Sequence, residues 1–519
     1  MHDWVSKWAV YSPQKVALKE AETGRMLTYG EWNRFGNHLA EYLTRDRGLQ
    51  KGDRIAVLAE SCLEYLILFS AAQKSGFILV PLNYRLCASE LDFMLRDAAP
   101  RLVIAEDRFL PLLEAAPHYG DMLEKWTLSR LWELCRAADS RKESAPFPPV
   151  QIEGNDPLFI LYTSGTTGFP KGAIYTHKML FWNSINTAMS LLVNTESRTI
   201  NCMPPFHTGG WNVLITPFLH HGGYTCLAKK FDAPAILHLL ETERPTIFMG
   251  VPTMLKMIAD APGFAAADVS GLHYLIVGGE PMPIPLIEKW HAKGVAVRQG
   301  YGMTEVGPNL TSLHQDDAIR KKGSIGRPNF YVSIRIAGED GGAAATGETG
   351  ELLLQGPMVT PGYWRNPEAT ATSIRGGWFH SGDLVRQDEE GFLYVVDRIK
   401  NMYISGGENV YPAEVERVIS AHEGVSEVAV IGVPDEKWGE AGKAFVVLKP
   451  GMVLTEGDIL DHCRGLMARY KVPKTAVVVQ ALPKTDSGKV DRKALGRVGV
   501  VHGHTTGYFY KRGKKSPRG

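Results

Sequence analysis

The sequence is poor in the features that mark a secreted, zinc-binding or membrane-spanning protein. Its 519 residues include only six cysteines, which lie far apart and form no C-x-x-C pair. We therefore expect reduced thiols, and neither a disulfide framework nor a zinc site. No apolar run approaches the ~18 residues that a membrane span needs. Residues 1–30 contain no apolar leader segment, so a cytoplasmic protein is expected.

The sequence also lacks an excess of either charge. Lysine and arginine number 57 against 56 aspartates and glutamates, which gives a net charge of +1. A near-neutral chain is poorly suited to bulk binding of a polyanion such as nucleic acid. The exception is the stretch 501–519, which has five basic and no acidic residues. We expect a disordered, solvated tail there, with a nucleic-acid or membrane role as the weaker alternative.

Short apolar runs do alternate with longer amphipathic stretches along about the first 400 residues. Runs that are apolar at successive positions suit strands buried on both faces, and stretches such as 62–74 suit the helices that connect parallel strands. The sequence therefore predicts an α/β fold. The expected strands lie at residues 54–59, 77–82, 101–105, 157–162, 246–250 and 274–278.

The pattern changes twice in the rest of the chain. From 323 to 397, glycine-rich turns separate short alternating strands, which predicts a small antiparallel barrel or sheet. After Lys400, helices and strands alternate as in a compact α+β domain. We place the domains at 1–399 and 400–500, with 501–519 as a tail. The expected later elements are strands at 332–336, 351–354, 391–396, 427–433 and 444–448, and helices at 412–421 and 456–468.

The strongest local signal is the segment from Leu161 to Gly172. It follows a predicted buried strand and combines four serines and threonines, three glycines and Lys171. Such a loop offers backbone N–H groups, hydroxyls and a cation to phosphate oxygens. Its spacing is not that of the G-x-x-x-x-G-K-[ST] loop. A flexible turn is the alternative, but it would explain neither the lysine nor the preceding strand.

Three further segments complete a longer pattern: 299–307, then 377–384 with 397–412, and finally 483–492. Together with the 161–172 loop, they resemble the adenylate-forming enzyme superfamily in its acyl-CoA synthetase branch. The resemblance covers nearly the whole chain, from about residue 29 to 495. It implies a large N-terminal domain, made of two doubly wound α/β sub-domains and a small β-barrel-like sub-domain. A small, mobile α+β C-terminal domain would follow.

The activity that the resemblance implies is that of an AMP-forming acid–thiol ligase. Such an enzyme joins a carboxylic acid to the α-phosphate of ATP, releases pyrophosphate, and then passes the acyl group from AMP to CoA. Because two anions meet in the first step, catalysis depends on positioning and on charge compensation by cations, hydroxyls and Mg²⁺. ATP, Mg²⁺ and CoA are the implied cofactor and co-substrates.

The resemblance also implies roles for individual residues. Lys489 would be the mobile cation of adenylation, Thr304 the donor to the α-phosphate, and Thr163 and Glu305 the Mg²⁺ site. His207 would lie beside the substrate carboxylate, and Lys400 would be the hinge. The implied ATP contacts are Thr163, Ser164, Gly165, Thr166, Thr167, Lys171, Gly279, Glu280, Pro281, Gln299, Gly300, Tyr301, Gly302, Met303, Asp383 and Arg398. The implied CoA contacts are Ser405, Gly406, Gly407, Trp438 and Tyr470.

Plain structural explanations stay open for three of these aromatic positions. Tyr301 is either the ring that stacks on adenine or a core side chain. His207 is either a pocket residue or a core histidine. Trp211 stands four residues after His207, like the gating tryptophan of long-chain fatty acyl-CoA synthetases, and is either a ring that swings or a packed tryptophan. The expected acyl-pocket residues are His207, Thr208, Trp211, Val277, Gly278, Met303, Gly307 and Pro308.

The acid itself is the least determined part of the prediction. Residues 201–215 contain no acidic side chain, and a buried ammonium without one is costly, which disfavours an amino-acid substrate. We expect a medium- or long-chain fatty acid, with a benzoate- or coumarate-like aryl acid as the alternative. Amino-acid adenylation and a luciferase-like oxygenase are less favoured, and a non-catalytic scaffold would leave the motifs without purpose. The oligomeric state stays open and includes a homodimer.

Overall fold

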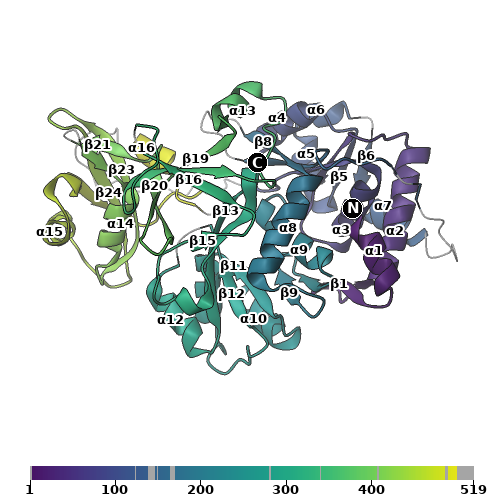
Figure 1. Ribbon diagram of the computed structural model, residues 1–519, viewed down its shortest axis with the longest axis horizontal. Helices are drawn as coiled ribbons and strands as arrows, with labels where there is room; N and C mark the ends of the chain where they lie inside the picture. Colours follow the sequence, from purple (N-terminus) through teal and green to yellow (C-terminus); the bar gives the residue numbers. More distant parts are fainter. Residues whose placement is uncertain are drawn as a thin grey trace, which may run out of the picture. The chain divides into compact units, whose positions relative to one another are not determined.

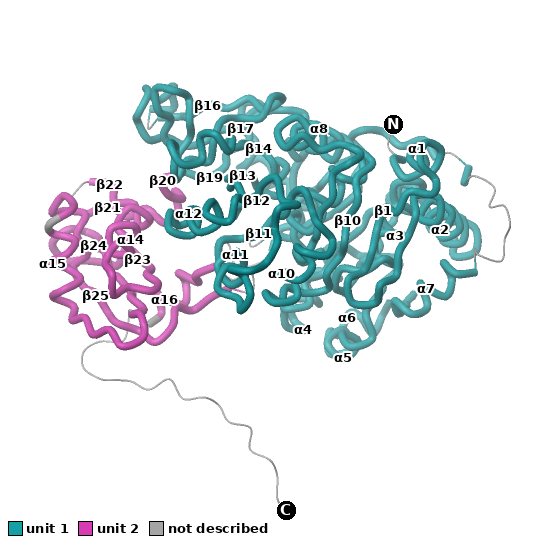
Figure 2. Tube along the Cα trace, turned by 90° about the horizontal axis from the view of Figure 1, so that it is seen from below, with its two compact units in different colours: residues 1–395 teal, residues 396–519 magenta. Residues whose placement is uncertain are grey.

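The structure, a computed structural model, forms two compact units, Met1–Val395 and Val396–Gly519 (Figure 2). The dividing point lies inside strand β20 (Leu393–Arg398), a few residues before the boundary expected at Lys400. The residues that the structure describes are 3–122, 124–137, 147–148, 150–163, 170–279, 282–338, 340–405, 408–485 and 489–498.

A six-stranded sheet forms the first part of unit 1, in the order β6-β5-β3-β4-β7-β8. All neighbours are parallel except the last pair, β7 and β8. Its strands are β3 (Arg54–Leu58), β4 (Ile78–Pro81), β5 (Leu102–Ala105), β6 (Lys125–Thr127), β7 (Pro157–Thr163) and β8 (Lys171–Thr176).

This sheet is buried on both faces, as the apolar runs predict. On β3, Ile55 and Val57 belong to one core, whereas Ala56 and Leu58 belong to another. The first core includes α2 (Tyr29–Glu41), α3 (Leu63–Ser75) and α7 (Leu128–Arg136), and the second includes α4 (Ala88–Ala98), α5 (Leu110–Glu114) and α6 (Pro117–Gly120). Every residue of α3 is buried, because this helix is enclosed on all sides. The sheet is therefore doubly wound (Figure 1).

A second sheet has the order β11-β12-β13-β14-β15. β11 (Ile247–Gly250), β12 (Tyr274–Val277) and β13 (Ala296–Met303) are parallel, while β14 (Gly307–Ser312) and β15 (Arg327–Pro328) are antiparallel. One core contains α10 (Ala233–Thr242), α11 (Pro252–Ala259) and α12 (Ile284–Ala292). The core of the other face contains residues of α8 (His177–Leu191) and α9 (Ile215–His220).

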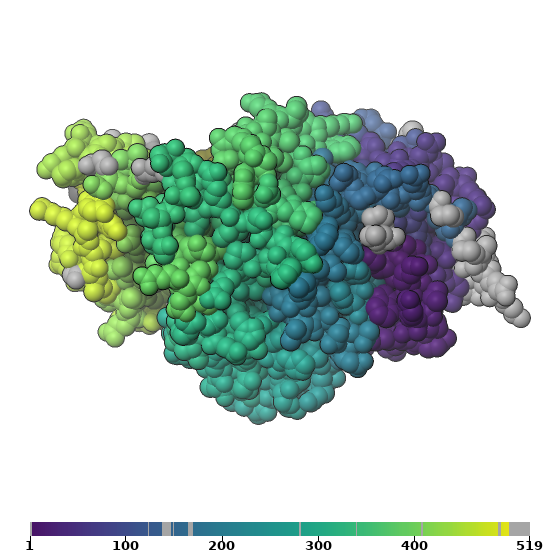
Figure 3. Space-filling view, in the orientation of Figure 1, coloured from purple at the N-terminus to yellow at the C-terminus, as the bar shows by residue number. Residues whose placement is uncertain are grey.

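A four-stranded sheet of order β2-β1-β10-β9 ties the N-terminal segment to residues two hundred positions later. β1 (Val16–Glu20) is parallel to β10 (Tyr224–Leu227), which is parallel to β9 (Arg198–Asn201), and β2 (Met26–Thr28) is antiparallel to β1. The preceding helix α1 (Trp4–Tyr11) places Trp4 on His220 of α9. Figure 3 shows the purple N-terminal segment beside a blue part of the chain from later in the sequence.

The glycine-rich part of unit 1 forms an antiparallel sheet with the order β16-β17-β19-β18. Its strands are β16 (Ser333–Ala337), β17 (Thr349–Gln355), β18 (Ile374–Arg375) and β19 (Trp378–Gln387), with α13 (Pro367–Ser373) before β18. Of the two alternatives, barrel or sheet, the structure has the sheet. Val306 and Leu310 share a core with its residues Leu352 and Phe379, so this sheet packs against the β13–β14 region.

Unit 2 is a small α+β unit with the strand order β22-β21-β24-β23, and β25 pairs with β24. Its helices cover a core that includes Val415, Val430, Val446 and Ile459. The strands are β21 (Tyr403–Ser405), β22 (Glu408–Val410), β23 (Val425–Asp435), β24 (Gly439–Leu448) and β25 (Thr475–Val478), and the helices are α14 (Pro412–Ser420), α15 (Glu456–Leu466) and α16 (Arg492–Val498).

The predicted α/β fold class, with a large first part and a small α+β second part, is confirmed. The six cysteines are free thiols, and only Cys87 is exposed. Within the described ranges, none of the helices has the length and apolar character required to cross a bilayer. The basic stretch 501–519 lies outside the described residues.

Candidate active site

The expected phosphate loop connects the only antiparallel pair of the six-stranded sheet. Thr163 ends β7, Lys171 begins β8, and the two residues lie directly opposite each other in the ladder. Gly172 is required here, because a Cβ at this position would lie 2.6 Å from Ile160 Cγ2. The hairpin thus holds the hydroxyl of Thr163 and the ammonium of Lys171 at the same end. Ser164, Gly165, Thr166 and Thr167 lie outside the described residues.

Glu305 lies in a tight turn between two antiparallel strands. β13 leads through the 3-10 turn Thr304–Val306 into β14. Gly302 permits the close approach of the two strands, because a Cβ there would lie 2.1 Å from the carbonyl oxygen of Pro308. A side chain at this glycine would push the strands apart. The turn brings Thr304 and Glu305 to the carboxyl end of the parallel strands, where open α/β sheets bind ligands.

The turn and the hairpin meet at one carboxylate oxygen. The Thr163 hydroxyl donates to Glu305 Oε1 at 3.2 Å, and the Tyr363 hydroxyl donates to the same oxygen at 3.0 Å. All three residues are half-buried. The structure therefore brings together the two residues expected at the Mg²⁺ site, and adds a tyrosine that the sequence analysis does not include.

These oxygens fit Mg²⁺ in kind. Mg²⁺ prefers oxygen ligands and is usually held by one or two carboxylates together with substrate phosphates. The part of the chain that the structure describes contains no cluster of three histidine, cysteine, aspartate or glutamate side chains that could hold a metal by itself. A carboxylate and a hydroxyl beside a phosphate loop suit a metal that arrives with a nucleotide.

The expected adenine slot lies at the ends of β12 and β13. Gln299 is the last buried residue of β13 and Gly300 follows it, and the amide N–H of Met282 donates to Gln299 Oε1 at 3.4 Å. Gly279 follows β12 with φ +86°, a conformation that favours glycine. Glu280 and Pro281 lie outside the described residues.

Among the expected nucleotide contacts that the structure describes, Asp383 is the most buried, with 2% of its surface exposed. The Tyr301 hydroxyl donates to Asp383 Oδ2 at 2.5 Å. The preceding turn is held by Glu351, because the Gly382 N–H donates to Glu351 Oε1 at 3.1 Å. His380 Nδ1 lies 2.8 Å from the other oxygen of Glu351. Tyr301 also packs against the core below, so it is a half-buried ring with a polar end.

The expected acyl segment forms a short 3-10 turn, Thr208–Gly210, that begins after His207. The His207 ring lies 4.5 Å from the Phe206 ring. Trp211, by contrast, is only 1% exposed. Its indole N–H donates to the Pro205 carbonyl oxygen at 2.7 Å.

Trp211 belongs to an aromatic cluster in the main core of unit 1. Its ring centroid lies 5.0 Å from that of Tyr65, 5.4 Å from that of Phe69 and 5.2 Å from that of Phe159. The preceding residue must be glycine, because a Cβ at Gly210 would lie 2.2 Å from the Pro204 carbonyl oxygen. In this structure the ring is a packed core side chain.

The remaining expected acyl contacts differ in their accessibility. Val277 is fully buried in the core beneath α10, α11 and α12. Gly278 and Met303 are partly exposed. Gly307 has φ +80°, and a Cβ there would lie 3.0 Å from Asn183 Oδ1. The side chain of Asn183 on α8 therefore limits the space beside Gly307 and Pro308.

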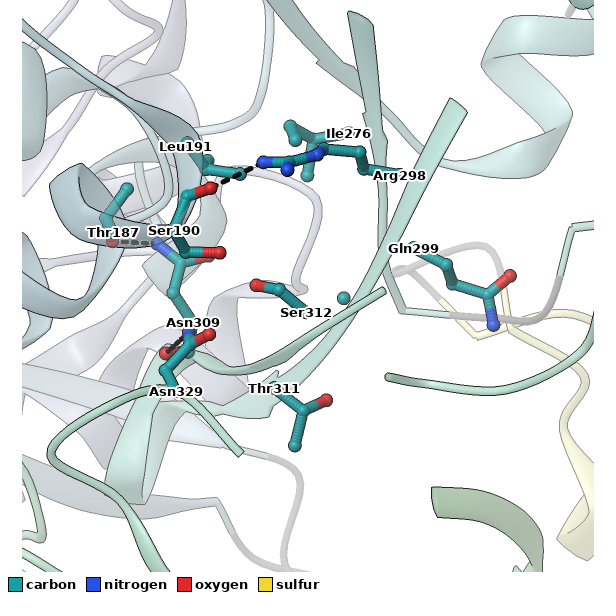
Figure 4. A pocket seen from close by; sticks show the side chains of 11 residues that line it. Thr187, Ser190, Leu191, Ile276, Arg298, Gln299, Asn309, Thr311, Ser312 and Asn329 are labelled. Carbon is teal, nitrogen blue, oxygen red and sulfur yellow. Dashed lines mark hydrogen bonds between the residues drawn. The ribbon is translucent and has the colours of Figure 1, made fainter. Parts of the chain in front are cut away.

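A buried polar network connects α8 with the acyl segment and β14. Asn183 Nδ2 donates to the Asn212 carbonyl oxygen at 2.7 Å. Asn309 Nδ2 donates to Thr187 Oγ1 and reaches the Asn212 and Val213 carbonyl oxygens at 3.3 Å. Figure 4 shows Thr187, Asn309 and Asn329 along one wall of a small cavity, with Arg298 and Gln299 on β13.

The other expected site residues belong to unit 2. Arg398 ends β20, Lys400 follows it, and Ser405 pairs with Gly439 of β24. Trp438 and Tyr470 are large exposed aromatics, at 49% and 40%. Lys489 is exposed, and its carbonyl oxygen accepts from the Thr485 N–H at 2.7 Å. Gly406 and Gly407 lie outside the described residues.

Tyr363, Glu351 and the asparagines of the polar network are not among the residues expected from the sequence. Each acts through a partner far away in the chain: Tyr363 lies 58 residues after Glu305, and Asn309 lies 122 residues after Thr187. A local pattern cannot reveal such pairs. The one available signal for Tyr363 is its position after Gly362 in a glycine- and proline-rich stretch that precedes a helix.

Four features together indicate the class of adenylate-forming enzymes. They are a doubly wound α/β unit, a hairpin that carries a hydroxyl and a lysine, an acid at the adjacent strand end, and a small α+β unit. Residues 5–364 match the AMP-binding enzyme family, and residues 414–489 match the AMP-binding enzyme C-terminal domain. The chain belongs to this family, which confirms the resemblance.

The relatives agree on the kind of reaction and differ in the acid. The chain is 39% identical over 488 residues to a feruloyl-CoA synthase of an Amycolatopsis species, covering 94% of this chain and 96% of the relative. It is also 39% identical over 492 residues, with the same coverage, to the long-chain-fatty-acid–CoA ligase FadD13 of Mycobacterium tuberculosis.

Solved structures give the same result. The o-succinylbenzoate CoA synthetase MenE of Bacillus subtilis, in complex with ATP and magnesium ion, superposes with a TM-score of 0.83. It is 30% identical, and the comparison covers 95% of this chain and 99% of that one. The predicted enzyme class, an AMP-forming acid–thiol ligase, is confirmed by these CoA ligases.

Proposed function

We propose that the protein is an ATP-dependent acid–CoA ligase whose substrate is a carboxylic acid with an uncharged, apolar tail. The observation that carries the proposal is the convergence of Thr163, Lys171 and Glu305 at one end of the large unit of an AMP-binding enzyme. Relatives that share this fold are named for joining CoA to feruloyl, fatty and succinylbenzoyl acids.

In the first half-reaction, the large unit binds ATP at the strand ends. Thr163 and Lys171 would contact the phosphates, and Thr304 would donate to the α-phosphate. When bound, Mg²⁺ compensates part of the phosphate charge, and Glu305 and Thr163 supply oxygens that suit it. Asp383 accepts hydrogen bonds only when ionised, so it suits the ribose hydroxyls. The residues of this half-site position the nucleotide and offset the charge that the carboxylate brings.

In the adenylation step, Lys489 would bring an ammonium to the substrate carboxylate and the α-phosphate. In the second half-reaction, the thiol of CoA attacks the acyl-adenylate carbonyl carbon and AMP leaves. The exposed rings of Trp438 and Tyr470, together with Ser405, are our proposed contacts for CoA. Lys400 is the proposed hinge between the arrangements that serve the two steps.

Within this class, we propose a compact aryl acid in preference to a long fatty acid. The acyl segment 201–215 carries no charged side chain except histidine, if protonated, so the tail of the acid should be uncharged. Trp211 is held by its hydrogen bond and by three neighbouring rings, which favours a fixed wall over a swinging gate. A fixed wall limits the length of the tail and favours the aryl alternative.

The decisive test separates the two half-reactions. The wild-type enzyme should exchange pyrophosphate into ATP only when an acid substrate is present, and should release AMP on adding CoA. Lys489→Ala should abolish the exchange yet still form thioester from a supplied acyl-adenylate. Equal loss of both activities would contradict the role of Lys489, and absence of acid-dependent exchange in the wild type would contradict the proposed function.

The substrate subclass needs a panel of acids under one assay. Straight-chain fatty acids from butanoic to hexadecanoic acid should be compared with benzoates and hydroxycinnamates by AMP release. We expect the highest kcat/KM among the aryl acids. A maximum at dodecanoic acid or longer would contradict the fixed-wall argument while leaving the ligase assignment intact.

A further inference from the structure

Tyr363 lies between two charged residues of the proposed phosphate site and contacts both. Its hydroxyl donates to Glu305 Oε1 at 3.0 Å. The Lys171 Nζ lies 5.5 Å from the centroid of its ring, within the range of a cation–π contact. One side chain therefore contacts an acid with its polar end and a cation with its ring. Neither contact belongs to the roles derived above.

The backbone fixes this position from two sides. The Trp364 N–H donates to the Gly172 carbonyl oxygen at 2.7 Å, which ties the segment to β8. The Thr360 N–H donates to the Glu305 carbonyl oxygen at 2.7 Å, which ties it to the turn. The distance between Tyr363 and Glu305 is therefore fixed by main-chain hydrogen bonds as well as by the hydrogen bond between their side chains.

The Glu305 carboxylate accepts two hydrogen bonds, and the one from Tyr363 is the less shared with other acceptors. The single proton of the Thr163 hydroxyl is shared, because Thr163 Oγ1 lies 3.2 Å from Glu305 Oε1 and 3.4 Å from the Lys171 carbonyl oxygen.

Both hydrogen bonds fall on Oε1, and no residue within the described ranges donates to Oε2 of Glu305. A carboxylate that is held at one oxygen presents the other in a fixed direction. Mg²⁺ demands near-ideal octahedral geometry, so the direction of that oxygen affects how tightly the metal is bound.

We propose that Tyr363 is a positioning residue of the metal and phosphate site: its hydroxyl orients Glu305 toward Mg²⁺, and its ring holds the ammonium of Lys171 beside the phosphates. This inference rests on the proposed function. The two roles use different parts of one side chain, and substitutions can separate them.

The first measurement concerns the metal. Mn²⁺ serves as the probe, and its binding in the presence of α,β-methylene-ATP is followed by the loss of the free-ion EPR signal. Tyr363→Phe keeps the ring and removes the hydroxyl, so the apparent Mn²⁺ dissociation constant should rise about 3- to 10-fold. The matched control is Tyr224→Phe, which removes a tyrosine hydrogen bond of 2.7 Å to Glu243 elsewhere in unit 1. It should leave Mn²⁺ binding unchanged.

The second measurement concerns the ring. Binding of α,β-methylene-ATP is measured in EDTA, where no metal contributes. Tyr363→Phe should bind as the wild type does, whereas Tyr363→Leu should bind about 2- to 5-fold more weakly, because the ammonium of Lys171 loses its aromatic partner. Should the leucine variant fail to fold, Tyr363→Met gives the same comparison with an unbranched side chain.

A double-mutant cycle distinguishes positioning from a general structural effect. In a Glu305→Gln background, Tyr363→Phe should cause no further loss of Mn²⁺ binding, because its effect passes through the carboxylate. Full additivity, or unchanged Mn²⁺ binding in Tyr363→Phe alone, would overturn the metal role. Equal nucleotide binding by the phenylalanine and leucine variants would overturn the ring role. Acid-dependent pyrophosphate exchange by the wild type shows separately whether the proposed function holds.

Discussion

At the scale of single residues, the packing of Trp211 bears on whether the proposed acyl segment has a fixed wall or a swinging gate. A swinging gate needs free volume beside the ring and few contacts to break. Trp211 has three aromatic neighbours, a hydrogen bond to Pro205 and a close-packed glycine before it. Each contact would have to be given up if the ring left this position, so the energetic argument favours a fixed side chain.

Trp211→Ala should therefore act mainly on stability. Removing a fully buried indole leaves a cavity and an unpaired carbonyl oxygen, and we expect a loss of about 3–5 kcal/mol in the free energy of unfolding. Urea unfolding followed by circular dichroism measures it. Trp211→Phe keeps most of the ring volume and should lose less. A variant with unchanged stability and new activity on hexadecanoic acid would show that Trp211 is a gate.

At the scale of elements, helix α8 covers a sheet and also forms hydrogen bonds to the proposed site. Its buried asparagine and threonine side chains hydrogen-bond to the acyl segment and to β14, so the helix fixes the distance between two parts of the proposed site. Buried polar groups are costly unless they are paired, and a paired network specifies one arrangement. The cavity of Figure 4 lies next to this network.

Asn309→Ala tests this network. The substitution removes the side-chain amide that donates to Thr187 Oγ1 and to the carbonyl oxygens of Asn212 and Val213. These buried acceptors then lose the hydrogen bond from residue 309. We expect a loss of about 1–3 kcal/mol in the free energy of unfolding, measured in urea. Asn194→Ala, at an exposed position, is the control and should change stability less. Equal effects in the two variants would show that the network contributes nothing beyond an ordinary surface hydrogen bond.

We expect the contact between α1 and α9 to depend on pH. His220 stacks on Trp4 at 4.0 Å, and burial, with a smaller contribution from His221, lowers the pKa of His220 to about 3. Because a histidine in an unfolded chain titrates near ~6.5, the unfolded state gains a proton below that pH and the folded state does not. The stability is fully present above pH ~6.5 and is lost as the pH falls toward 3, by up to ~1.4 kcal/mol per unit.

His220→Gln should remove this pH dependence. At about pH 7.5 the variant should melt at a lower temperature than the wild type, because the stack on Trp4 is lost, and at about pH 5 the difference should shrink. Thermal melts across this range measure it. His238→Gln, on the exposed side of α10, should follow the wild type at every pH. A constant difference between wild type and His220→Gln would contradict the linkage.

The elements themselves were largely predictable, and the contacts between them were not. The apolar runs at 54–59, 157–162 and 274–278 correspond to β3, β7 and β12, because strands buried on both faces need successive apolar residues. The packing of Trp211 and the meeting of Tyr363 with Glu305 depend instead on which distant segments the fold brings together. Hydrophobic periodicity contains no information about such pairs.

At the scale of the whole molecule, the expected site residues are divided between the two units. Thr163, Glu305 and Asp383 belong to the large unit, and Arg398 and Lys489 belong to the small one. A reaction with two half-steps can use such a division, because different faces of a small unit can serve each step in turn. The chain between the units is then a functional element, and Lys400 is the residue that we propose as its pivot.

Lys400→Pro tests the pivot directly. Proline fixes φ near −65° and restricts the residue before it, so the link should favour one arrangement of the units. We expect acid-dependent pyrophosphate exchange to persist while thioester formation from a supplied acyl-adenylate falls at least about tenfold, or about 1.4 kcal/mol in activation free energy. Lys400→Ala removes the side chain but keeps the backbone free, and both of its half-reactions should stay close to wild type. Wild-type rates of thioester formation in the proline variant would show that the chain does not turn at Lys400. Equal loss in both half-reactions would show that the substitution damages the fold around β20 and does not act on the rotation of the small unit.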